Sequence, residues 1–439
     1  MEGTLARNLP FRTLARSLVG NKIFRQATEL VGWQVAVKAI SFFTTAWMVR
    51  CMGPRNLGVS GLIMSTSAAC TIFVNLGLDI LGTRKVAAAK EESKGIIELV
   101  LGLRWRVGIC LFALYVAYAI YLLVTRSEFY KAWFIGAVFM FTSALSTNWI
   151  LQGLEELPIQ NRVMSLTSVL AAAAYVLLFR PGMPAGSDLA VLTGSNIVGL
   201  WLIWRHVHKR TGASVFGRFD FREVKGLLYE SRWAFAVVCT VFVYGQLDMI
   251  LLARLASLEQ AGIYRAAFSL ITPISLLTAI SSSLLYPRFV VWLKQSPQRM
   301  WQRQKKIALT YLAVGSVGVA VLFIVGPPLV RLLFGRRFDA SIWPFLILFA
   351  SRIEVLINGV FGWGIMASGG DKLFVLSSVV AALFSLSSNI YCIPRYGAVA
   401  AASASFAAEG IIVLLTMYFC WRRFARPNTG NQSLRVGSK

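Results

Sequence analysis

The sequence is poor in the side chains that most catalytic and metal sites use. Its 439 residues include 19 Asp and Glu, 6 Cys and 2 His, against 44 Lys and Arg. His206 and His208 share a basic stretch without further metal ligands, and the cysteines show no CxxC spacing. The sequence also lacks a GxxxxGK[ST] phosphate loop, an HExxH motif and a Ser/His/Asp set. We therefore expect no metal, no cofactor and no enzymatic chemistry.

Charge of either sign is scarce over long stretches. Hydrophobic residues make up 57% of the chain and charged residues 14%, and the mean hydropathy is +0.65. Apolar runs of about 20 residues, the length that crosses a bilayer, occur about twelve times. They lack the period-two alternation of a membrane barrel, and backbone groups in hydrocarbon must be satisfied internally. The predicted fold is an all-α polytopic membrane protein of about twelve transmembrane helices.

The net charge of +25 is concentrated between these runs. If the N-terminus is cytoplasmic, most Lys and Arg fall in cytoplasmic segments, which is the positive-inside pattern. We therefore predict that both termini are cytoplasmic, that the basic segments contact anionic membrane lipids, and that the chain binds no nucleic acid.

The two halves of the chain carry a repeated layout. Four residues recur at one constant offset: Arg50, Gly58, Ser65 and Arg84 are matched by Arg254, Gly262, Ser269 and Arg288. Such repeats commonly frame a central transport site. The predicted domains are a basic cytoplasmic N-terminal segment, 1–29, an N-lobe of helices one to six, 30–205, a basic cytoplasmic linker, 206–232, a C-lobe of helices seven to twelve, 233–421, and a cytoplasmic tail, 422–439.

Several segments together resemble a known family. They are MVRCMGPRNLGVSGLIMS, in which Met52 replaces the usual leucine, then NLGLDILGTRKVA, LDMILLARLASLEQAGIYRAAFSLITPI, LYPRF, LFGRRFDAS and NIYCIPRYGAVAAA. In order and spacing they are similar to the polysaccharide-transporter branch of the superfamily that also holds the multidrug exporters and the peptidoglycan-precursor flippases. The chain most resembles the Wzx-like O-antigen and exopolysaccharide repeat-unit flippases, over about residues 25–420.

This resemblance implies a V-shaped bundle of two six-helix lobes around a central, typically cationic cavity. It implies a flippase that moves undecaprenyl-diphosphate-linked oligosaccharide across the bacterial inner membrane by alternating access. Polysaccharide polymerase and chain-length proteins are candidate partners. The lipid tail must stay in the bilayer, so we expect a lateral opening near spans one and eight.

Charged residues inside predicted spans are the candidate functional groups, because each costs roughly 2.5–3.5 kcal/mol at the bilayer centre. Lys38, well inside the first span, is expected to contact a substrate phosphate; a buried ion pair is the alternative. Arg352 and Glu354 interrupt the tenth span. Two residues apart on a helix they differ by roughly 200° and cannot pair well with each other. We assign Arg352 to substrate binding and Glu354 to ion coupling or a counter-ion role.

Further candidates lie deeper in the C-lobe or near span ends. Asp248 in span seven, Glu409 in span twelve and Asp79 after span two are predicted ion-coupling residues or counter-ions. Arg50 and Arg254, at repeat-related positions, are predicted to bind substrate. Because long side chains snorkel at span ends, a purely structural role is the alternative there.

Two other functions compete with the flippase. An ion-coupled small-molecule (multidrug) antiporter would favour an acidic, aromatic-lined cavity. A membrane-bound glycan polymerase or ligase would need a sizeable outer loop carrying Arg or His, and the loops predicted on that side are short.

Overall fold

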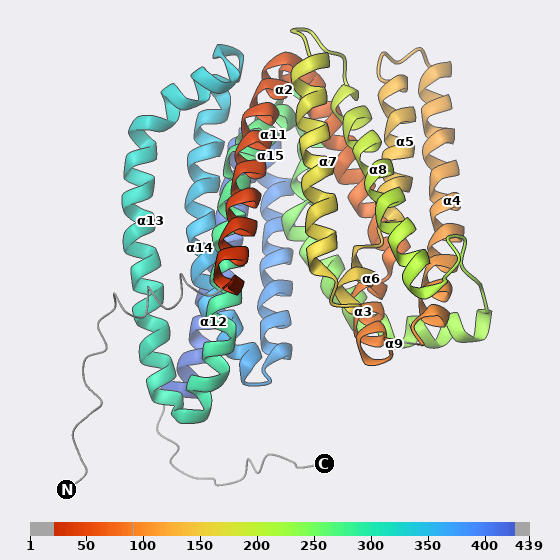
Figure 1. Cartoon of the computed structure of the whole chain (residues 1–439). Helices are drawn as coiled ribbons and strands as arrows, with labels where there is room; N and C mark the ends of the chain where they lie inside the picture. The colour runs from red at the N-terminus through yellow and green to blue at the C-terminus, as the bar shows by residue number, and fades with distance from the viewer. Residues whose placement is uncertain (1–21, 91, 426–439) are drawn as a thin grey trace, which may run out of the picture.

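In the computed structural model, residues 22–90 and 92–425 are described, and every regular element within them is helical (Figure 1). The parts of the predicted terminal segments at 1–21 and 426–439 lie outside the described residues. The α-helices are α2 Lys22–Asn75, α3 Leu78–Ala88, α4 Lys94–Val124, α5 Tyr130–Ala144, α6 Asn148–Gly153, α7 Leu157–Leu178, α8 Ser187–Thr211, α9 Phe221–Gly245, α10 Leu247–Leu255, α11 Leu258–Ile271, α12 Ser275–Gln295, α13 Pro297–Phe334, α14 Ile342–Ala367 and α15 Asp371–Cys420. The shorter helical turns are η1 Thr272–Ile274, η2 Arg336–Ser341 and η3 Trp421–Ala425.

Ten helical segments of the described chain are long and apolar enough to cross a membrane. Two of them, of 41 and 55 residues, are about twice the length that one crossing needs. Each contains a glycine with non-helical backbone, Gly53 at φ 74° in α2 and Gly397 at φ 54° in α15, and each folds back there. The ten segments thus supply about twelve crossings, and the prediction of an all-α polytopic membrane protein is confirmed.

Helix extends into the region predicted as a linker, 206–232. Helix α8 continues to Thr211, and α9 begins at Phe221 after Asp220, whose carboxylate accepts hydrogen bonds from the backbone N–H groups of Arg222 and Glu223. The first turns of α9 bury Val224 and Leu227 against the α3–α4 region. Because α9 has this apolar face, only the short stretch between Thr211 and Phe221 lies outside the two helices.

The helices lie roughly along one direction, with α13 at one edge of the molecule and α4 at the other (Figure 1). Between these edges α2 packs on α11, and α14 packs on α15. The largest hydrophobic cluster lies at this centre and joins α2, α7, α10, α11, α13, α14 and α15. Segments far apart in sequence therefore meet at the middle of the bundle, next to the cavities that α2 and α11 line.

Candidate functional site

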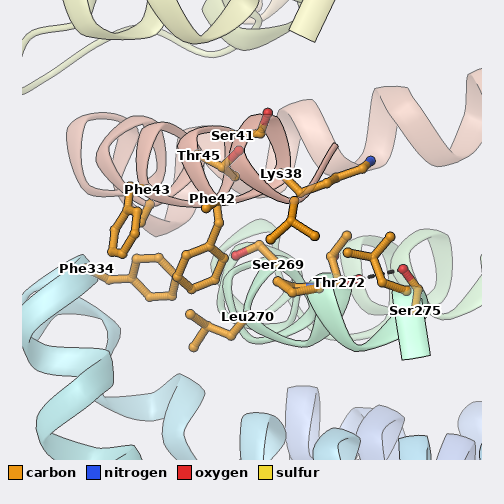
Figure 2. A pocket seen from close by; sticks show the side chains of 15 residues that line it. Lys38, Ser41, Phe42, Phe43, Thr45, Ser269, Leu270, Thr272, Ser275 and Phe334 are labelled. Carbon is orange, nitrogen blue, oxygen red and sulfur yellow. Dashed lines mark hydrogen bonds between the residues drawn. The ribbon is translucent and has the colours of Figure 1, made fainter. Parts of the chain in front are cut away.

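A cavity of about 540 Å³ lies between α2 and the α11–η1–α12 segment, and we call it the lateral cavity. Lys38 of α2 lies at one end of it, and the rings of Phe42, Phe43 and Phe334 lie at the other (Figure 2). The side chain of Lys38 is exposed, and within the described chain it forms no salt bridge. The cavity therefore combines an unpaired cation with an aromatic wall.

A second cavity of about 480 Å³, the central cavity, adjoins the first. The two share four lining residues with hydroxyl groups: Ser41, Thr45, Ser269 and Thr272. Helices α7 and α8 complete the lining of the central cavity on the side of the first half of the chain. Neither lining contains a carboxylate, and the cations in them are Lys38 and Arg265. The two cavities adjoin each other, and the charged side chains that the described chain places in their linings are positive.

Arg265 on α11 is not among the predicted site residues, yet it lies at the centre of the bundle, in the lining of the central cavity. Its guanidinium donates to the carboxylate of Asp188 on α8 at 2.6 Å and to the backbone carbonyl of Leu57 on α2 at 3.0 Å. The side chain of Asp188 is fully buried and that of Arg265 is 15% exposed. No spacing in the sequence relates these two residues, so the pairing could not have been found there.

Asp248 on α10 lies in a closed polar cage. Its carboxylate accepts hydrogen bonds from the Tyr264 hydroxyl at 2.9 Å, the Ser405 hydroxyl at 2.7 Å and the Asn389 amide at 2.7 Å. These donors come from α11 and from both halves of α15. A small cavity of about 180 Å³ is lined by Asp248, Tyr264 and Arg265, and it shares Arg265 with the central cavity. Among the described residues this carboxylate has no basic partner within salt-bridge distance, and it lies beside the central cavity.

Arg352 and Glu354 of α14 both interact with Glu409 of α15. The charge of Arg352 acts on the Glu409 carboxyl, which is 8% exposed, and the charge of Glu409 acts in turn on Glu354. The Arg352 guanidinium also lies 5.9 Å from the ring of Phe268, a lining residue of the central cavity. One oxygen of Glu354 and Nε of Arg352 are buried without a hydrogen-bond partner in the described chain. As the helical spacing predicted, Arg352 and Glu354 form no salt bridge with each other within the described residues. Their charges are connected through Glu409.

The remaining predicted site residues lie outside the cavities. Asp79 on α3 pairs with the fully buried Arg104 of α4 at 2.6 Å. Arg50 is exposed, and its guanidinium reaches the backbone carbonyl of Leu332 at 3.5 Å. Arg254 is exposed in the last turn of α10. The structure therefore brings Lys38 into the cavities and Arg352 behind their wall, and it does not gather Asp79, Arg50 or Arg254 with them.

Comparison with known proteins agrees with this architecture. The family described as "Polysaccharide biosynthesis protein" matches residues 23–292. A protein of Escherichia coli strain K12 named "Putative O-antigen transporter" is 22% identical over 394 residues, 87% of this chain and 92% of its own length. A protein of the same name from Shigella dysenteriae is 22% identical over 392 residues, 86% of this chain and 94% of its own length.

Solved structures share the fold at low sequence identity. The lipid II flippase MurJ in an inward closed conformation superposes with a TM-score of 0.69 at 11% identity, covering 89% of this chain and 87% of that one. An inward-facing multidrug resistance transporter of the MATE family gives 0.64 at 13% identity, covering 88% and 94%. The family match spans more than half of the chain, and the sequence resemblance is thereby confirmed: this chain belongs to the polysaccharide biosynthesis protein family.

Proposed function

We propose that this protein is a flippase that moves undecaprenyl-diphosphate-linked oligosaccharide repeat units across the bacterial inner membrane by alternating access, for O-antigen or exopolysaccharide synthesis. One observation carries the proposal: the adjoining lateral and central cavities contain Lys38 and Arg265, and the described chain places no carboxylate in their linings. A diphosphate esterified by a lipid at one end and a sugar at the other is a compact dianion, and Lys and Arg are the side chains that bind phosphate oxygens best. The names of the E. coli relative and of MurJ support the same class of substrate.

The lateral cavity allows the headgroup to enter from the membrane while the lipid tail stays in the bilayer. Its lining combines Lys38 with the apolar side chains of Phe42, Phe43, Leu270 and Phe334 (Figure 2). A polyprenyl chain is as apolar as the bilayer interior, so it gains little from leaving the lipid phase. An opening between α2 and the α11–α12 segment lets the diphosphate and sugars enter while the tail stays in the membrane, at spans one and eight.

After Lys38, Arg265 and Arg352 are the next cations that would bind the phosphates of the substrate. Arg265 is already paired with Asp188, so a phosphate in the central cavity would share its guanidinium, which has five N–H donors. Arg352 lies behind the ring of Phe268 and would reach the cavity through a rotation of that ring. In this proposal Lys38 makes the first phosphate contact, and the arginines hold the headgroup during rocking of the lobes.

Asp248 is the coupling group of this proposal, because it is a buried carboxylate with three donors and, within the part of the chain that the structure describes, no basic partner. Intramembrane carboxylates of this kind commonly serve as ion or proton sites. Its cage joins α10, α11 and both halves of α15, so a change of its charge would reach all of them. Glu354 and Glu409 are secondary candidates for the same role.

Translocation in liposomes tests the proposal. We expect purified protein to move a fluorescent undecaprenyl-diphosphate-linked oligosaccharide from one leaflet to the other. Lys38→Ala, Arg265→Ala and Arg352→Ala should each lower the rate at least tenfold. The control Arg299→Ala removes an exposed cation at the start of α13 and should leave the rate unchanged. Wild-type protein that moves no lipid-linked sugar would contradict the flippase; intact rates in all three variants would contradict the site.

The ion-coupled small-molecule antiporter remains the second candidate, and the caged carboxylate of Asp248 beside a small cavity favours it. It predicts uptake of a cationic dye under a proton or sodium gradient by the same liposomes, lost in Asp248→Asn. Dye transport without lipid transport would select this function. Both candidates are transporters. The flippase proposal also includes two further statements: both termini are cytoplasmic, and the protein contacts polysaccharide polymerase or chain-length proteins.

A further inference from the structure

A fourth cavity differs from the others in its chemistry. It encloses about 290 Å³ between α5, α6, α7 and α8, and we call it the hydroxyl-lined cavity. Most of its lining residues carry a hydroxyl or an amide: Thr142, Ser143, Ser146, Thr147, Asn148, Thr167, Ser195 and Asn196. The rest are Gly, Val, Met, Leu and Ile, so the lining has no charged side chain.

A break in a membrane-spanning segment forms one wall of this cavity. Residues 130–153 are apolar enough to cross the membrane as one segment, yet α5 ends at Ala144 and α6 begins at Asn148. Irregular backbone at this depth is tolerated where protein buries it or where it lines a polar cavity. The break is fixed in place by the buried Arg104, which donates to the carbonyl of Ser146 at 2.9 Å. A helix interrupted beside a cavity is typical of a binding site in a transporter.

Two polar groups of this lining, those of Thr147 and Asn196, are incompletely hydrogen-bonded within the described chain, whereas the hydroxyls of Thr142 and Thr167 donate to carbonyls of their own helices. Thr147 is 3% exposed, and its hydroxyl oxygen has no hydrogen-bond partner in the described chain. Asn196 reaches the hydroxyl of Ser143 at 3.3 Å, longer than the usual distance for such a bond. Buried polar groups that lack partners cost stability, so such a group in a cavity indicates a ligand or a water.

The hydroxyl-lined cavity adjoins the central cavity. Thr167, Ser195 and Asn196 line both, and the central cavity holds the Arg265 guanidinium. A ligand that extends from one to the other therefore has an anionic part beside Arg265 and a neutral, hydrogen-bonding part among hydroxyls and amides.

We propose that the hydroxyl-lined cavity binds the sugar residue nearest the diphosphate of the lipid-linked substrate and thereby selects which glycan is moved. This inference rests on the proposed function. Sugars offer many hydroxyl groups and no charge, and hydroxyl and amide side chains match them as both donors and acceptors. The volume lies near the lower end of the range for small-molecule sites, roughly 300–1,000 Å³, which suits one sugar ring and excludes a whole repeat unit.

The test compares lipids that differ only in this part. Liposomes with full-length protein are given bare polyprenyl diphosphate, the same lipid with one hexose, and the same lipid with one N-acetylhexosamine. We expect Thr147→Val and Asn196→Ala to lower the rate for the preferred sugar-bearing lipid, relative to the bare lipid, about tenfold. Thr147→Val keeps the shape of the side chain, so folding is preserved, and thermal unfolding verifies it. The control Thr310→Val removes a hydroxyl on α13 that bonds only within its own helix.

The outcomes separate the two proposals. A lowered ratio in both variants but not in the control supports the sugar site. An unchanged ratio in both variants, with wild-type transport of sugar-bearing lipids, overturns the sugar site and leaves the flippase intact; the cavity then holds water only. A wild-type protein that moves none of the lipids overturns the flippase and the sugar site with it.

Discussion

Gly58 on α2 and Gly262 on α11 lie backbone against backbone at the crossing of their helices. A Cβ atom on Gly58 would collide with the carbonyl of Leu258, and one on Gly262 would collide with the carbonyl of Pro54. Pro54 and Leu258 are related by the same sequence offset as Gly58 and Gly262. Each half of the chain therefore contacts the other through equivalent positions. The contact has the self-complementary form of an interface between two identical subunits.

Alanine at either glycine is therefore expected to force α2 and α11 apart. Gly58→Ala and Gly262→Ala should each lower the free energy of unfolding by about 1–3 kcal/mol, the usual cost of overpacking. Gly226→Ala in α9 is the matched control, because a Cβ there meets no atom within 4 Å. Thermal unfolding in detergent, followed by tryptophan fluorescence, measures the difference. Equal unfolding temperatures for Gly58→Ala and Gly226→Ala would contradict the close crossing.

Asp79 and Arg104 should respond unequally to mutation. Arg104 is fully buried, hydrogen-bonds Ser146 and lies over the ring of Trp149, whereas the side chain of Asp79 is 46% exposed. Asp79→Ala leaves a buried cation without its partner and is expected to cost about 3–5 kcal/mol. Arg104→Met leaves a carboxylate that water can reach, and we expect a smaller loss, about 1–2 kcal/mol. Chemical denaturation of the two variants measures both losses, and the reverse order would show that the contacts of Arg104 with Ser146 and Trp149 outweigh its pairing with Asp79.

Arg265 and Asp188 allow stability to be separated from function. Arg265→Gln leaves the fully buried Asp188 unpaired and should cost about 3–5 kcal/mol. The double variant Arg265→Gln with Asp188→Asn removes both charges and is expected to recover most of that stability. Lipid translocation should stay low in the double variant, since the phosphate-binding cation is still missing. Recovery of transport together with stability would make Arg265 a structural residue only.

The cage around Asp248 can be tested without changing its charge. Tyr264→Phe removes one of the three donors, leaves the carboxylate buried, and should lower the free energy of unfolding by about 1–3 kcal/mol. If Asp248 couples transport to an ion gradient, the same variant should also shift the gradient dependence of translocation. Tyr311→Phe on α13, which removes a half-buried hydroxyl bonded to Ser281 on another helix, is the control for losing an interhelical tyrosine hydrogen bond. Identical gradient dependence in the wild type and Tyr264→Phe would argue against Asp248 as the coupling group.

The sequence alone was sufficient for the class of protein, its helical fold and its family. Each apolar run reports its own ability to cross a bilayer, because in hydrocarbon a segment must satisfy its own backbone hydrogen bonds. The repeat was also readable, since Gly58 and Gly262 stand at the same distances from a matching arginine and a matching serine in the two halves of the chain. Lys38 could be singled out because one charge in an apolar run is a local signal, and the structure places it in the lateral cavity.

Only the tertiary structure decided which polar groups meet. Arg265 finds Asp188, Asp79 finds Arg104, and Asp248 finds Asn389 and Ser405, each across a different pair of helices. The break between α5 and α6 was likewise hidden inside a run that reads as one continuous span. The rotation of each helix and its crossing angle determine which side chains meet. Both depend on packing between segments that are distant in sequence, and the hydropathy of a single segment carries no information about that packing.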